Sequence, residues 1–291
     1  MTGETGAPRV SAVILFHNEE AFLPEAVESV AGQGFDAYEI LMVDGGATPE
    51  CLAVARALCA QDPSRRRLIQ HPDRNAMGVG DLRGFGFSHA RGEFLASLDA
   101  DDVWLPGKAT AQVALLDAHP DATMVYGRTE IWSSWDASAA ATDFFYDLGL
   151  EPDRLVPGDE ALRVMIGNRA QTPTTCNAMM RRRVVEQVGG CEARFAGMFE
   201  DQALFAKLMA VGPVYVSSQP WARYRQRGVS MSNAASDLAT ARVRRSLLLW
   251  LERWLRAHGQ AGRHLRRALR AEQRRAAANL LRLAVKRWLG R

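Results

Sequence analysis

The sequence predicts an α/β fold in which a mostly parallel sheet is flanked by helices. Short apolar segments rich in β-branched residues alternate with stretches of helical periodicity, in the order β-α-β-α-β-α-β. Polar clusters follow three of the predicted strands, at the ends where ligands bind in sheets of this kind. The 291 residues are 47% hydrophobic and 24% charged, which allows a sizeable core.

The N-terminal third of the chain supplies the first four strands. Residues 10–16 are apolar and β-branched, which predicts a strand buried on both faces. A helix is expected at 24–30 because its apolar residues form one stripe, and Gly32 and Gly34 end it. By the same criteria, strands are expected at residues 39–43, 68–71 and 93–98, and helices at residues 49–60 and 82–90.

The middle of the chain is expected to be less regular. Residues 133–153 are rich in small residues and contain several aromatic ones, and we interpret them as a loop over the site. From residue 239 onward the pattern is helical. Between these limits the periodicity predicts strands at residues 122–126 and 214–216 and helices at residues 108–118, 158–166, 181–188 and 201–210.

The composition argues against several classes of protein. No stretch reaches ~18 uninterrupted apolar residues, so a membrane-spanning helix is not expected. Residues 1–8 lack the basic-then-apolar order of a signal peptide. The four cysteines form no C-x-x-C pair and fit no zinc spacing, which favours free thiols in a reducing cytoplasm.

Charge divides the chain into two parts. Residues 242–291 contain 15 Lys and Arg against two acids, whereas the rest carries a net charge of −10. We therefore expect a catalytic domain at 1–236 and a basic amphipathic helical tail at 237–291. The tail either packs on the domain with a solvated basic face or lies on an anionic membrane, on the inner face of which the protein would then be peripheral. Binding to nucleic acid is not expected.

The acidic run Asp99-Ala100-Asp101-Asp102 is the strongest local signal. Three carboxylates crowded at a strand end repel one another, and bound Mg²⁺ or Mn²⁺ would relieve that repulsion. Taken alone, the run fits a solvated turn that caps the next helix equally well. Because two more polar clusters follow neighbouring strands, we favour a metal site that bridges a diphosphate to the protein.

Other polar residues support two readings each. Asp44 could accept hydrogen bonds from a base or a ribose, or be an ordinary turn aspartate before two glycines. Arg83 is either a cation near a phosphate or a surface arginine. Asp201, which follows Glu200, could be a general base or a plain helix cap. Arg223, Arg225 and Arg227 could hold a diphosphate or form a solvated basic loop.

Taken together, these motifs resemble glycosyltransferase family 2 over residues 9–232, in order and spacing. The polar turn after the first strand, the acid after the second and the Leu-Asp-x-Asp-Asp block all have counterparts in this sequence. The matching segments are Phe16-His17-Asn18-Glu19-Glu20, Ser29 to Gln33, Asp44-Gly45-Gly46, Leu82-Arg83-Gly84, Leu98 to Asp102, Trp104-Leu105-Pro106, Arg181-Arg182, Gly189-Gly190, Glu200-Asp201 and Tyr224-Arg225-Gln226-Arg227 with Ser230.

The resemblance implies a Rossmann-like GT-A fold and an inverting, non-processive transfer from a nucleoside diphosphate sugar, usually a UDP-sugar, to an acceptor hydroxyl. The acceptor could be a glycan, a lipid-linked intermediate, a natural product or a peptide. Residues 9–105 would form the nucleotide-sugar-binding half and 106–236 the acceptor half. Asp201 would be the catalytic base, and Asp101 with Asp99 would hold Mn²⁺ or Mg²⁺. The substrate-binding residues would be Phe16, Asn18, Glu19, Asp44, Arg83, Asp99, Glu200, Arg225 and Arg227.

Three departures from the family pattern keep alternatives open. Gly45 replaces the usual second acid, which weakens the inference of a particular base. Gly84 replaces an asparagine, and Arg227 replaces a histidine near the diphosphate. A binding module that has lost catalysis therefore stays open, as does a nucleotidyltransferase, although the glycine-rich phosphate loop expected of the latter is missing near the first strand.

Overall fold

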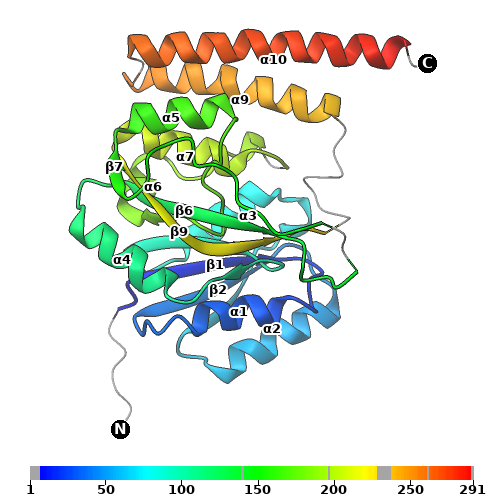
Figure 1. The fold of residues 1–291 in the computed structure, drawn as a ribbon. Coiled ribbons are helices and arrows are strands. Elements are labelled where there is room, and N and C mark those ends of the chain that lie inside the picture. The colour runs from blue at the N-terminus through cyan, green and yellow to red at the C-terminus, as the bar shows by residue number, and fades with distance from the viewer. Residues whose placement is uncertain (1–6, 139–140, 196, 228–236, 261, 290–291) are drawn as a thin grey trace.

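The computed structural model describes residues 7–138, 141–195, 197–227, 237–260 and 262–289. A single sheet crosses the molecule, with helices on both faces and two further helices stacked outside one of them (Figure 1). Its strand order is β3-β2-β1-β4-β8-β6-β9-β5, with β7 paired to β9. The predicted α/β class with flanking helices is confirmed.

The first half of the sheet is parallel, as expected. It contains β1 (Val10–Phe16), β2 (Tyr38–Asp44), β3 (Arg66–Gln70) and β4 (Phe94–Asp99). Every residue of β1 and β2 is buried, because both strands have neighbours on each side and helices on each face. The register pairs Phe16 with Asp44 and Leu15 with Asp99, so the polar strand ends meet at one edge.

The second half of the sheet is mixed, and sequence reasoning described it less well. β6 (Met124–Trp132) and β9 (Val214–Arg225) are longer than the predicted strands at 122–126 and 214–216. The strands β5 (Val103–Trp104), β7 (Arg154–Val156) and β8 (Met179–Arg181) were not predicted. Strands of two or three residues show no period, and the polar stretch from 217 to 220 hides the continuity of β9.

The helices divide between the two faces of the sheet. On one face lie α1 (Leu23–Ala31), α2 (Pro49–Gln61) and α4 (Lys108–Ala118). The other face is covered by α3 (Val79–Ser88), α5 (Gly158–Gly167), α6 (Arg182–Gln187) and α7 (Glu200–Val211), with the short 3-10 helices η1 (Arg74–Ala76) and η2 (Ala193–Phe195) in connecting segments. Each face thus buries its own hydrophobic core.

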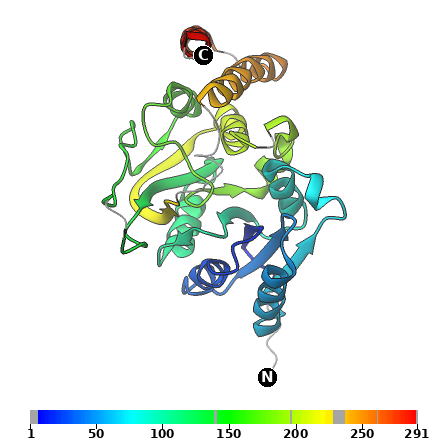
Figure 2. The same cartoon turned by 90° about the vertical axis from the view of Figure 1, so that its right-hand side faces the viewer.

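The basic tail forms α9 (Asp237–Ala257) and α10 (Arg263–Leu289). Apolar residues of α9 join the core that α5 and α7 build, and Phe195 packs edge-on against Trp250 at 5.3 Å. α10 packs on both α9 and α5 and is the outermost helix of the molecule (Figure 2). Packing on the domain therefore holds for α9 and for the first part of α10, where Leu265 and Leu269 are buried. None of the helices in the described ranges is long and apolar enough to cross a membrane.

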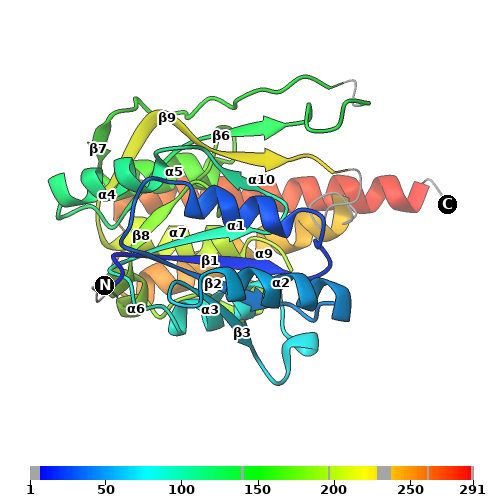
Figure 3. The same cartoon turned by 90° about the horizontal axis from the view of Figure 1, so that it is seen from below.

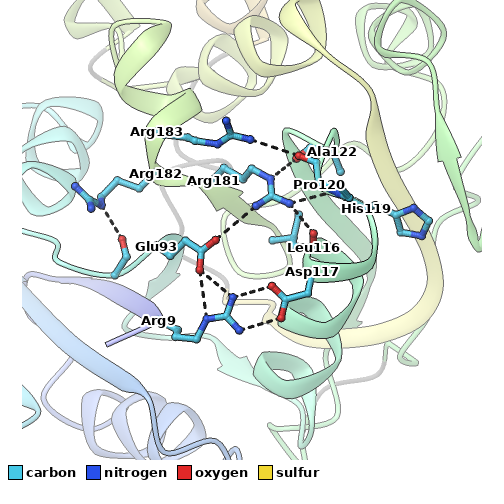
Figure 4. A network of polar contacts seen from close by, with 11 residues as sticks. Arg9, Glu93, Leu116, Asp117, His119, Pro120, Ala122, Arg181, Arg182 and Arg183 are labelled. Carbon is cyan, nitrogen blue, oxygen red and sulfur yellow. Dashed lines mark hydrogen bonds and ion pairs between the residues drawn. The ribbon is translucent and has the colours of Figure 1, made fainter. Parts of the chain in front are cut away.

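An arginine network ties the opposite end of the sheet together (Figure 4). Arg9, just before β1, forms a hydrogen-bonded ion pair at 2.8 Å with Glu93, just before β4, and another at 2.7 Å with Asp117 in α4. Arg181 donates to the carbonyl of Leu116, in the last turn of α4, and to those of His119 and Ala122, which follow that turn. These contacts fix the amino ends of β1 and β4, and leave their carboxyl ends for ligands.

Candidate active site

The three acids at the end of β4 have different surroundings. Asp99 accepts hydrogen bonds from Arg83 at 3.1 Å and from the Thr175 hydroxyl at 3.3 Å. Asp101 forms an ion pair with the Nε of Arg227 at 3.2 Å. Asp102 is 1% exposed, and one of its oxygens accepts the backbone N–H of Arg225 at 2.9 Å. Asp102 therefore holds β9 in place, while Asp99 and Asp101 face the site.

Asp101 has the electrostatics expected of a cation ligand. Burial, together with the negative charges of Asp99 and Glu19 and against the opposing charge of Arg227, raises the pKa of Asp101 to about 6. A divalent cation beside this carboxylate would remove the penalty. In the described parts of the chain, no group of three or more His, Cys, Asp or Glu residues is arranged to hold a metal. Mg²⁺ and Mn²⁺ sites that hold a phosphate usually take only one or two protein carboxylates, which is the number that Asp99 and Asp101 offer here.

Arg83 joins the end of β4 to the start of α7. Its guanidinium is 3% exposed and donates to the Ser97 hydroxyl, to Asp99 at 3.1 Å and to Glu200 at 3.5 Å. Burial alone would lower the pKa of Arg83, but the charges of Asp99 and Glu200 outweigh it, so the arginine stays protonated. The sequence allowed Arg83 to be either a cation near a phosphate or a surface arginine, whereas the structure buries it as a bridge between Asp99 and Glu200.

The first turn of α7 is held close to α3. Phe199 precedes it in a left-handed conformation with φ of 63°, which is uncommon for a bulky residue. A Cβ on Gly80 would lie 2.9 Å from the Cβ of Glu200, so this glycine permits the close approach. Sequence reasoning missed both residues, although a glycine near the start of a helix was the available signal.

Asp201 lies at the helix N-terminus beside Glu200. Its Oδ1 accepts the backbone N–H of Gln202 at 2.7 Å. Burial raises the pKa of Asp201, and the charge of Glu200 raises it further, whereas Arg83 opposes both. A carboxylate whose pKa is raised in this way is a stronger base than an ordinary aspartate.

Asp44 is more constrained than sequence reasoning expected. It is fully buried at the end of β2, and one oxygen accepts the backbone N–H groups of Gly46 and Ala47 at 2.8 and 2.7 Å. The other oxygen accepts from Gln70 at 2.8 Å and pairs with Arg74 at 2.6 Å. Burial raises the pKa of Asp44, but these hydrogen bonds and the charge of Arg74 lower it more, so the net shift is downward. A nucleotide base would hydrogen-bond to the second oxygen of Asp44 only after Gln70 or Arg74 gives up its contact with that oxygen.

The turn after β1 completes this edge of the site. Glu19 accepts the backbone N–H groups of His17 and Asn18 at 2.8 and 3.1 Å, and its other oxygen lies 3.7 Å from Arg227. Asn18 accepts the N–H of Thr48 at 3.1 Å. The Phe16 side chain is 2% exposed and belongs to the core, so any substrate contact by this residue involves its backbone.

Arg225, at the end of β9, and Arg227, two residues later, differ in exposure. Arg225 is 5% exposed, donates to the Asp101 carbonyl at 2.7 Å and pairs with Glu25 at 2.6 Å. Its guanidinium stacks over three aromatic rings, those of Phe22, Trp132 and Trp135. Arg227 is 25% exposed and lies between Asp101 and Glu19, which places it toward the site. Ser230 of the same motif lies outside the described residues.

The family model described as "Glycosyl transferase family 2" matches residues 11–189. The chain belongs to this family.

Curated relatives of this family 2 chain match only part of their own length. The putative glycosyltransferase EpsE of Bacillus subtilis is 30% identical over 38% of this chain and 40% of the relative. A PGL/p-HBAD biosynthesis glycosyltransferase of Mycobacterium bovis is 32% identical over 52% of this chain and 55% of the relative. The matched part of this chain thus spans about half of these proteins or less.

Solved structures share the fold. TarS 1-349 of S. aureus in complex with UDP-GlcNAc has a TM-score of 0.64 at 18% identity, covering 83% of this chain and 66% of that one. The mannosyltransferase PcManGT of Pyrobaculum calidifontis in complex with GDP-Man and Mn²⁺ has a TM-score of 0.60 at 19% identity, covering 96% and 76%. The fold of this family 2 chain is therefore GT-A.

The family 2 chain also has an aromatic loop beside the carboxyl end of β6. Ile131 of β6 forms an isolated antiparallel bridge with Phe144. The side chains of Phe144, Phe145 and Tyr146 are 43%, 39% and 54% exposed. Exposed aromatic residues clustered in this way mark a contact surface for a ligand or partner.

Proposed function

We propose that this chain is an inverting glycosyltransferase that moves one sugar from a nucleoside diphosphate sugar to an acceptor hydroxyl in the cytoplasm. The observation that supports the proposal most is the bridge made by Arg83. One guanidinium contacts both Asp99, at the carboxyl end of β4, and Glu200, at the start of α7. The bridge joins the acidic run to the helix start that carries Asp201, the proposed base, although about 100 residues separate them in the sequence.

The donor half, 9–105, would bind a UDP-sugar. Asp101 and Asp99 would hold Mn²⁺ or Mg²⁺, which supplies charge neutralisation on the departing diphosphate. The proposed nucleotide site lies beside Phe16, at the end of β1, and beside Asn18 and Glu19 in the turn after it. Asp44 would contact the nucleotide base once the base replaces Gln70 or Arg74. Arg227 would place its guanidinium near the diphosphate, whereas the partners of Arg225 favour a positioning role.

Asp201 would act as the base. As the acceptor oxygen forms its bond to the anomeric carbon, the bond from that carbon to the diphosphate oxygen breaks on the opposite face, which inverts the configuration. The acceptor proton passes to the Asp201 carboxylate, and the nucleoside diphosphate leaves. The acceptor half, 106–236, would present the aromatic loop to a glycan, lipid-linked, natural-product or peptide acceptor.

Replacing Asp201 by asparagine tests the base. We expect Asp201→Asn to lose transfer by about 100-fold or more while donor affinity stays within about threefold. Asp159→Asn is a matched control, because Asp159 also lies in the first turn of a helix, α5, on the exposed surface. Normal turnover by Asp201→Asn would remove Asp201 from this role.

A thermal-shift panel of UDP-, GDP- and dTDP-sugars, each with and without Mn²⁺, tests the donor. We expect one UDP-sugar to stabilise the protein most, and only with the metal. Slow hydrolysis of that donor without acceptor would distinguish an enzyme from a binding module. Stabilisation by no nucleotide sugar would overturn the proposal.

A further inference from the structure

The outer face of α10 has two zones of different chemistry. In the arginine zone, Arg263, Arg266, Arg267, Arg270 and Arg274 recur at helical spacing. Together with Arg256 of α9 they line a groove with a volume of about 760 Å³. In the apolar zone, the exposed side chains also recur at helical spacing: Leu281 (68% exposed), Val285 (46%), Trp288 (75%) and Leu289 (70%).

Both zones lie on one side of the helix. Leu281 follows Arg263 by about five turns at 3.6 residues per turn, so the two side chains point the same way. The opposite side packs inward through Leu265 and Leu269, and Gln273 donates to the Leu248 carbonyl of α9 at 3.2 Å. The outer face therefore makes no contribution to this packing, yet it concentrates both positive charge and apolar surface.

The positive charge is only partly neutralised. Glu252 of α9 lies 2.5 Å from Arg256 and 4.0 Å from Arg270. Within the described ranges, no carboxylate lies within ion-pair distance of Arg263, Arg266, Arg267 or Arg274. The surface is thus built for an anionic partner.

We propose that the outer face of α10 docks on an anionic phospholipid bilayer. The arginine zone would contact lipid phosphates, and Leu281, Val285, Trp288 and Leu289 would insert at the headgroup boundary. A nucleic acid or acidic protein would satisfy the arginines but would leave a tryptophan and three aliphatic side chains in water. A second copy of the chain would bring two arginine zones together. A bilayer satisfies both zones at once.

The fold gives this docking an orientation. The carboxyl ends of β1 and β9 and the C-terminal end of α10 lie toward the same side of the molecule in two perpendicular views (Figures 1 and 3). Docking of the outer face would therefore lay α10 along the bilayer, with the carboxyl edge of the sheet at the same end of the molecule as the apolar zone. The docking itself does not depend on the proposed sugar transfer.

Sedimentation of the full chain with vesicles tests the proposal. We expect binding to vesicles of phosphatidylcholine with phosphatidylglycerol and none to phosphatidylcholine alone. The triple variant Arg263→Gln, Arg267→Gln, Arg270→Gln should bind about 100-fold more weakly. Arg56→Gln, Arg163→Gln, Arg183→Gln removes the same charge from other exposed positions and should bind normally.

The apolar zone has its own readout. Brominated lipids should quench Trp288 fluorescence, and Trp288→Phe should remove that part of the quenching while retaining sedimentation. Leu281→Ser with Leu289→Ser should lower partitioning at least tenfold and make the remainder sensitive to salt. Three outcomes would overturn the proposal. The two triple variants could lose binding equally, or brominated lipids could fail to quench Trp288. The third outcome is that the Leu281/Leu289 variant loses self-association and nothing else.

Discussion

Asp101 and Asp102 are neighbours in the sequence but lie in different surroundings. Asp101 is 23% exposed and faces Arg227, whereas Asp102 is 1% exposed and accepts the N–H of Arg225. The acidic pattern alone could not assign these roles, because both residues satisfy it equally. The backbone of β9, which arrives from about 120 residues later, makes the distinction.

Asparagine at each position should separate the roles. Asp101→Asn is expected to lower transfer by about 100-fold or more, because it removes a charged ligand of the cation. Asp102→Asn keeps an oxygen for the Arg225 N–H and should retain activity within about threefold. Activity assays across a Mn²⁺ titration would check both. Equal losses would contradict the assignment.

Activity should depend on pH through Asp201. The base must be deprotonated, and burial, followed by the charge of Glu200, raises its pKa. Transfer should therefore fall as pH decreases through a value above the ordinary aspartate range of about 3.9. Glu200→Gln removes the neighbouring charge and should shift this acid limb to lower pH. A profile of kcat/KM against pH that stays flat down to about pH 4 would contradict the prediction.

At the scale of elements, prediction succeeded where a segment has a long, uniform environment. The predicted strand at 10–16 and helix at 108–118 have the observed bounds of β1 and α4. α3 begins three residues earlier than the predicted 82, because glycines at 78 and 80 obscure its first turn. That same turn positions Glu200, so the part of α3 that the sequence describes least well is the part nearest the site.

Two glycines of α3 allow a matched test of this packing. Gly80→Ala would place its Cβ 2.9 Å from Glu200 and should destabilise the protein by about 1–3 kcal/mol. Gly84→Ala meets only the Cys191 side chain, at 3.4 Å, and should be neutral or stabilise by up to about 1 kcal/mol. Urea denaturation would measure both, and equal effects would argue against the α3–α7 contact.

At the scale of the molecule, the charge asymmetry predicted a separate tail, but the tail is unequal along its length. Residues of α9 from Leu247 to Leu255 share the core with α5 and α7, whereas the end of α10 is exposed. Both helices are basic and amphipathic, so the charge pattern predicted one continuous tail. The length of α10 that packs inward depends on the shape of the domain beneath it.

Truncation should reveal this difference. A chain that ends after residue 280 loses exposed apolar side chains and the half-buried Leu283, and its Tm should change by less than about 3 °C. A chain that ends after residue 236 loses the buried side chains of α9 and exposes the apolar surface of α5 and α7 that they cover. Each lost side chain is worth about 1.5–3 kcal/mol, and the set comprises Leu247, Leu248, Trp250, Leu251 and Leu255. That sum is comparable to a whole domain's stability. Calorimetry should therefore show no cooperative unfolding for the shorter chain, and a normal transition would make the tail a separable domain.

The hydrogen bond from the Arg225 N–H to Asp102 constrains the length of β9. Side chains alternate along a strand, so deleting one residue between 221 and 225 would turn the next side chain to the opposite face. Arg225 would then leave its aromatic stack, and Arg227 would no longer reach Asp101. Substitutions in this segment change one contact each, but a change in residue count disconnects all of them together. We therefore expect β9 not to tolerate an insertion or deletion between residues 221 and 225.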